Sequence, residues 1–176
     1  MRKLFLGFSA GILIVLLAGF CYVRFGFVDP RADIPINSFD KAVAMPSLDA
    51  SVDRRAPEVR NPVPPTDANL IAGMKLYQEN CSSCHGDIHR PRGIFAAAFY
   101  PRPPQFLEDA PDMPENQNFY IIQHGIRLSG MPAWKQVLNE QQMWQVTTFL
   151  SRMDKLPPQV SDAWKAEASS PTNGNP

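Results

Sequence analysis

Apolar and polar positions follow three different patterns along the chain, and each pattern predicts a different kind of segment. Residues 4–23 form an uncharged apolar run of about the ~20 residues that span a hydrocarbon core. From residue 24 to 65 seven prolines and no sustained period predict an extended linker. From residue 66 to 156 apolar residues recur at helical spacing without strand alternation, which predicts a mainly α domain.

The apolar run at residues 1–23 is expected to be an uncleaved single-pass transmembrane helix. Arg2 and Lys3 precede it, and it ends in Phe20, Cys21 and Tyr22. A secretory signal peptide has a shorter apolar region and ends in small residues, so this pattern favours an anchor. The last segment, residues 157–176, lacks apolar periodicity, and we expect a flexible tail with at most one turn around Trp164.

The first helix of the domain is expected to begin at Thr66 or Asp67, either of which can cap it. Positions three and four apart then place four side chains on one face, namely Leu70, Met74, Tyr77 and Cys81. Gly73 lies on this same face, where glycine costs about 1 kcal/mol relative to alanine. We therefore expect another backbone or a bulky ring to approach the helix at this glycine.

Two more helices follow a long proline-rich stretch. Asp112 is expected to cap the second helix and Gly125 to end it. Asn139 with Gln142 three positions later predicts a capping box for the third, which the prolines at 157–158 should end. The core offered by three short helices is small, and a large apolar cofactor at its centre would explain the domain's stability.

The stretch CSSCHG at residues 81–86 places two cysteines three positions apart, with a histidine directly behind the second. A zinc site would lack a convincing fourth ligand, a thioredoxin-like dithiol needs a preceding strand, and a disulfide leaves the histidine unexplained. Haem c accounts for all three residues, because Cys81 and Cys84 can form its two thioether bonds while His85 binds the iron. We therefore expect one covalently bound haem c, with its proximal imidazole held by a carbonyl of residues 91–104.

The iron also needs a sixth ligand or an open site. The candidates downstream are His89, His124, Met113, Met131, Met143 and Met153. Met131 is favoured, because Gly130 and Pro132 fix a turn that lets its thioether approach a flat ring. His124 is the main rival, although a histidine at a helix end is more often a cap. Three side chains are candidates for hydrogen bonds to haem propionates: Arg102, Arg127 and Trp134.

Four segments carry a resemblance to a known family: GMKLYQENCSSCHGD, YPRPPQF, IIQHGIRLSGMPAW and EQQMWQVTTFL. In this order they resemble class I (monohaem) cytochromes c, especially the domains found in subunits of haem–copper oxidases and membrane dehydrogenases. The resemblance implies a class I cytochrome c fold, three to five short helices around one covalent haem. It also implies that His85 and Met131 are the axial ligands, and that Gly73 and Tyr77 cross the last helix near Phe149.

These expectations together predict a membrane-anchored electron-transfer protein, either a tethered shuttle or a subunit of a respiratory or dehydrogenase complex. An iron with both axial positions filled leaves no place for a substrate, so we expect no catalysis and no small-molecule substrate. The formal net charge of zero argues against a nucleic-acid partner. Because thioether attachment takes place outside the bacterial cytoplasm, the haem domain should lie on the periplasmic side of the inner membrane. The alternative is a haem-based sensor or peroxidase-like protein with a labile sixth ligand.

Overall fold

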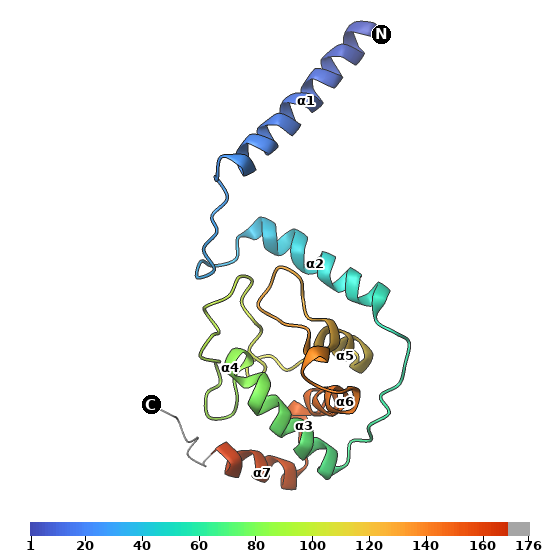
Figure 1. Cartoon of the computed structure of the whole chain (residues 1–176), viewed down its shortest axis with the longest axis vertical. Helices are drawn as coiled ribbons and strands as arrows, with labels where there is room; N and C mark the ends of the chain where they lie inside the picture. The colour runs from blue at the N-terminus through green and yellow to red at the C-terminus, as the bar shows by residue number, and fades with distance from the viewer. Residues whose placement is uncertain (169–176) are drawn as a thin grey trace. The chain divides into compact units, whose positions relative to one another are not determined.

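The computed structural model describes residues 1–168, which are helical without any strand (Figure 1). The chain divides into two units, which part between Arg31 and Ala32. The first unit contains α1 (Arg2–Arg24), whose residues are all exposed and whose mean hydropathy reaches 2.5. Among the described residues it is the one helix long and apolar enough to cross a membrane, a property that signal sequences near an N-terminus share.

The core of the second unit is the crossing of α3 (Asp67–Asn80) and α6 (Glu140–Leu150). A Cβ placed on Gly73 would lie 2.1 Å from the carbonyl oxygen of Gln145, so only glycine lets the two backbones come this close. The Tyr77 and Phe149 rings meet at the same crossing, with their centroids 5.5 Å apart. The expected close approach at Gly73 is therefore confirmed.

The helix ends follow the sequence signals in part. Asn139 and Gln142 form the predicted capping box of α6, and α5 (Glu115–His124) ends at Gly125 as expected. The prediction of Asp112 as the cap of α5 is wrong, because Pro114 occupies the cap position and no side chain caps the helix. The unit also contains short one-turn helices, namely α4 (Ser82–His85), η1 (Trp134–Gln136) and η2 (Met153–Lys155).

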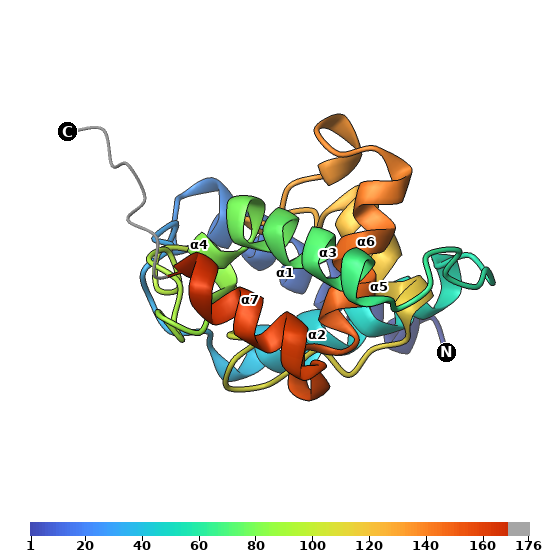
Figure 2. The ribbon, with the colours of Figure 1, turned by 90° about the horizontal axis from the view of Figure 1, so that it is seen from below.

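The expectation of a tail without regular structure is wrong for α7 (Pro158–Ala168), while residues 169–176 lie outside the described part. The two prolines at 157–158 begin this helix rather than only ending the previous one, since proline fits the first turn. Val160 and Trp164 lie four positions apart and are both buried. The Trp164 ring packs edge-on against Phe149, 5.1 Å between centroids, and α7 lies beside α3 (Figure 2).

The expectation of an irregular linker is likewise wrong for α2 (Ser38–Arg55). Asn37 caps this helix by accepting a hydrogen bond from the backbone of Asp40. The helix continues through Pro46, and it packs on α5, with Val52 only 3% exposed. Few apolar residues face the domain, which is why no helical period is visible in the sequence.

Candidate haem-binding site

A cavity of about 490 Å³ opens between α3, α4, α5, α6 and the loops around them. Its volume lies in the range of cofactor sites, ~300–1,000 Å³. Its walls are mainly apolar; they include Tyr77, Phe99, Phe106, Ile121, Ile122, Val146 and Leu150. The cavity therefore suits a large, flat, apolar group with a few polar contacts.

The CSSCHG motif forms one wall of this cavity. The single turn α4 follows directly on α3, and the backbone amides of Cys84 and His85 each donate to the Cys81 carbonyl at 3.0 Å. This turn brings Cys81, Cys84 and His85 together at the cavity. Both cysteines are free thiols, and burial raises the pKa of Cys81 to about 12, so its thiol is protonated at neutral pH.

The His85 imidazole is fixed by two neighbours from the loop that follows. Its Nδ1 lies 2.9 Å from the Pro104 carbonyl oxygen and donates to it, since a carbonyl can only accept. Its ring stacks on Phe106, with centroids 4.3 Å apart and planes 6° from parallel. Burial lowers the pKa of His85, which favours the neutral ring, although the Pro104 hydrogen bond opposes this shift. Nε2 is thereby the nitrogen left to bind a metal, and the expected carbonyl of residues 91–104 is Pro104.

Tyr77 and Gln105 stabilise this wall. Neither was expected from the sequence to belong to the site. The Tyr77 hydroxyl donates to the Gly86 carbonyl at 2.6 Å. The Gln105 amide donates to the Cys84 and Pro103 carbonyls at 3.0 and 2.8 Å, and accepts from the Gly93 amide at 2.9 Å. No spacing in the sequence pairs Gln105 with positions twelve and twenty-one residues earlier, so only the folded loop reveals this role.

The candidates for the sixth ligand separate clearly in space. Met131 and Met113 both line the cavity that contains His85. His89 is exposed, and His124 is exposed with its Nδ1 3.4 Å from the Lys135 amine. The other two methionines, Met143 and Met153, are buried in the helical core. The ligation by Met131 itself stays a prediction.

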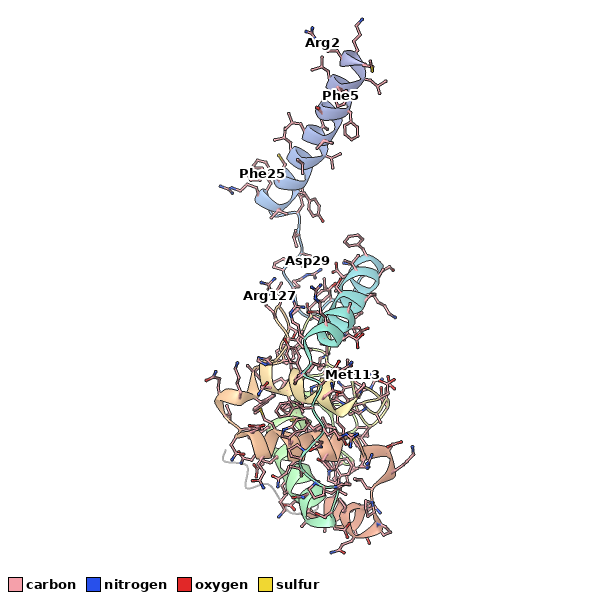
Figure 3. The ribbon with its side chains drawn as sticks, turned by 90° about the vertical axis from the view of Figure 1, so that its right-hand side faces the viewer. Arg2, Phe5, Phe25, Asp29, Met113 and Arg127 are labelled. Carbon is pink, nitrogen blue, oxygen red and sulfur yellow. The ribbon has the colours of Figure 1, made fainter. Side chains whose placement is uncertain are left out.

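Met131 is placed by a tight turn after α5. Gly125 has φ +65° and ψ −171°, a conformation that is essentially restricted to glycine. The Ile126 amide then donates to the Met131 carbonyl at 3.1 Å, and the Met131 amide donates to the Ser129 hydroxyl at 3.1 Å. Figure 3 labels Arg127, an exposed residue of this turn, and Met113, which precedes α5 in the sequence.

The polar lining is mixed: three aspartates line the cavity, namely Asp49, Asp109 and Asp112, together with two candidate hydrogen-bond donors for an acidic group. The Nε1 of Trp134 is buried beside the cavity without a hydrogen-bond partner among the described residues, and Arg102 also lines the cavity. Arg127 is exposed and does not line it. Haem carries propionates that both side chains could bind, so the residues present fit haem c. Among residues 1–168 no group of three or more His, Cys, Asp or Glu side chains is placed to hold a metal ion.

Comparisons with known proteins agree with this geometry. The family model described as cytochrome c oxidase, cbb3-type, subunit III, matches residues 68–150. The chain is also 31% identical over 121 residues to the quinohemoprotein alcohol dehydrogenase ADH-IIG of Pseudomonas putida. This match covers 66% of the chain but only 16% of the dehydrogenase. No solved structure gives a significant match.

The matched segment contains the CSSCHG motif, the His85 wall and the turn of Met131, so motif, cavity and family agree on one kind of cofactor, a covalently bound haem c. Residues 68–150 are therefore a class I cytochrome c domain.

Proposed function

We propose that the chain is a single-haem electron-transfer protein in which His85 and Met131 are the axial ligands of the iron. One observation carries the proposal: a fixed imidazole and a methionine turn line the same apolar cavity, beside two free cysteines. The haem iron supplies a one-electron couple. The protein would hold the His85 imidazole through its hydrogen bond to the Pro104 carbonyl and would present the Met131 thioether to the iron. Its apolar cavity wall would exclude water.

The proposed ligand pair favours electron transfer over substrate chemistry. A thioether is a soft ligand that stabilises the reduced iron relative to a second nitrogen ligand, and so raises the reduction potential. With both axial positions filled, no substrate or gas can bind without displacing the Met131 sulfur. A sensor or peroxidase-like protein would instead need that position to be open or labile.

We also propose that residues 1–23 anchor the haem domain, residues 66–156, to the bacterial inner membrane on its periplasmic side. Support comes from the length and apolar composition of α1, and from the extracytoplasmic attachment of haem c. A tether raises the effective concentration of the domain near partners on the same membrane, so each contact can remain weak. The partners would be redox proteins or a dehydrogenase or respiratory complex; co-purification in mild detergent at fixed stoichiometry would favour a fixed subunit over a shuttle.

The ligand assignment is tested by the variant Met131→Ala in the full chain, with Met113→Ala as the matched control, because both thioethers line the cavity. We expect Met131→Ala to lose the red-edge absorbance band of methionine ligation in the oxidised protein. It should also have a lower midpoint potential and bind carbon monoxide when reduced. Met113→Ala should keep the band and exclude carbon monoxide.

Two results would contradict the proposal. If Met131→Ala retained the band while Met113→Ala lost it, Met113 would be the ligand. If the wild-type reduced protein bound carbon monoxide readily, the sensor or peroxidase-like alternative would be favoured instead.

A further inference from the structure

Helix α2 takes part in the same cavity as the cytochrome c motif, although it lies before residues 68–150. Three of its side chains, Met45, Leu48 and Asp49, line the cavity together with Cys84 and His85. Figure 1 shows the loops before and after α5 extending toward α2, which runs along that side of the domain. A helix that served only as a spacer would have no reason to contribute to the cofactor cavity.

The first end of α2 is fastened to the loop that holds the proximal imidazole. The Tyr100 hydroxyl donates to the Asp40 carboxylate, and the Asn37 amide lies 3.4 Å from the same hydroxyl oxygen. The hydrogen bond to Asp40 raises the pKa of Tyr100, so the phenol stays protonated and able to donate at neutral pH. Tyr100 lies four residues before Pro104, so this contact links α2 to the His85 side of the cavity.

The second end of α2 is fastened to α5, which leads into the Met131 turn. The Gln117 side-chain amide donates to the Asp53 carboxylate at 2.7 Å, and the Asn116 side chain donates to the Pro57 carbonyl at 3.0 Å. Val52 is buried next to this end, at 3% exposure. The helix is therefore held at both ends, to the loop whose Pro104 carbonyl contacts His85 and to the helix that precedes the Met131 turn.

The middle of α2 differs from its ends, because its apolar side chains remain partly exposed. Met45 is 41% exposed and Leu48 is half-buried, and both line the cavity. Val43, on the same helix, is 50% exposed and does not line the cavity. Met45 and Leu48 are thus the α2 side chains placed to cover an apolar group in the cavity.

We propose that α2 is a strap that completes the haem pocket, with Met45 and Leu48 as additional haem-contacting residues held in place by the contacts at Tyr100 and Asp53. The proposal rests on haem occupying this cavity. The strap would exclude water from the edge of the group that faces α2. A drier pocket disfavours the more highly charged oxidised iron, so the strap would raise the reduction potential.

The experiment compares Leu48→Ser and Met45→Ser with Val43→Ser in the full chain, matured with haem. The three variants place a polar residue on the same helix, but only the first two alter the cavity wall. We expect a lower midpoint potential for Leu48→Ser and Met45→Ser, with the methionine band retained, and an unchanged potential for Val43→Ser. If all three variants and the wild type had the same midpoint potential, the proposal that α2 is a strap would be wrong.

The fastening is tested separately by Tyr100→Phe, with Tyr120→Phe as a control that removes a hydroxyl elsewhere in the domain. Loss of a hydrogen bond to a charged carboxylate should speed hydrogen exchange of the α2 amides about tenfold. Exchange in α3 and α6 should not change. Unchanged hydrogen exchange of the α2 amides in Tyr100→Phe would contradict the fastening.

The two proposals can fail separately. A wild-type protein without a haem c spectrum would contradict the proposed function itself, whereas unchanged midpoint potentials in a red protein would contradict the strap alone.

Discussion

The two sides of the cavity are built in different ways. On the proximal side, contacts between residues far apart in the chain fix His85: Pro104 accepts from its ring, Phe106 stacks on it, and Gln105 bonds to the backbone around it. On the distal side, the hydrogen bonds around Met131 come from within its own turn, at Ile126 and Ser129.

This difference predicts different behaviour of the two proposed ligands, His85 and Met131. The imidazole is held by the tertiary structure, so its position depends on the stability of the whole domain. The thioether is held by a short, partly exposed turn, which can open locally while the helices stay folded. We therefore expect Met131 ligation to be lost under milder conditions than the haem pocket as a whole.

The largest effects are expected from a matched pair of glycines, Gly86 on the proximal side and Gly125 on the distal side. Both follow a helix in nearly the same glycine-restricted conformation, with φ of +81° and +65°. A Cβ on Gly86 would lie 2.2 Å from the Pro91 carbonyl oxygen, and one on Gly125 would lie 2.6 Å from that of Met131. Backbone strain alone costs about 1–3 kcal/mol at such positions, and the contacts add to it.

Gly86→Ala should therefore lower the free energy of unfolding while the methionine band is retained in the folded protein. Gly125→Ala should displace the Met131 turn and lose that band at temperatures where helicity by circular dichroism is unchanged. Parallel measurement of the band and of helicity during heating checks both outcomes. If both variants lost the band and helicity together, the two sides would not be independent.

The sequence predicted the parts of the site that depend on local patterns. The CSSCHG spacing predicted that Cys81, Cys84 and His85 act together, and all three line one cavity. The glycine on the apolar face of α3 predicted a close approach, which the family resemblance assigned to the last helix and which occurs at α6. Such features depend on neighbours within one helix or one turn. They can therefore be read without knowing the fold.

The sequence did not predict features that depend on tertiary contacts. Helix α7 has two buried apolar side chains, Val160 and Trp164, which are too few to show a period. The Trp164 ring packs against Tyr77 and Phe149, which lie far away in the sequence. Helix α2 contains a proline and faces the cavity with only a few apolar residues. The roles of Gln105 and of the Pro104 carbonyl depend on the path of an irregular loop, which propensities do not specify.

A smaller effect is expected from removing one side-chain anchor on each side. Gln105→Ala removes three hydrogen bonds to the proximal backbone, and at roughly 0.5–1.5 kcal/mol each this should lower the free energy of unfolding by about 1.5–4.5 kcal/mol. Ser129→Ala removes hydrogen bonds to Ile126 and Met131 within the turn. Ser129→Ala should leave the free energy of unfolding in denaturant nearly unchanged, but it should lower the temperature at which the methionine band disappears. If the two variants had equal free energies of unfolding, the proposed difference between the proximal and distal sides of the cavity would be contradicted.

The smallest effect is expected at Leu128, the exposed end of the distal turn. Its φ is +63°, unusual for a residue other than glycine, and its side chain is 85% exposed, so it loses little packing when removed. Leu128→Gly relieves roughly 1–2 kcal/mol of left-handed strain, but glycine loses about 0.5–1 kcal/mol more conformational entropy on folding. The net gain should be about 0–1.5 kcal/mol and confined to the turn, so the methionine band should persist to a slightly higher temperature while the global unfolding transition stays the same. A shift of the global transition instead would mean that the distal turn is coupled to the helical core as strongly as the proximal side is.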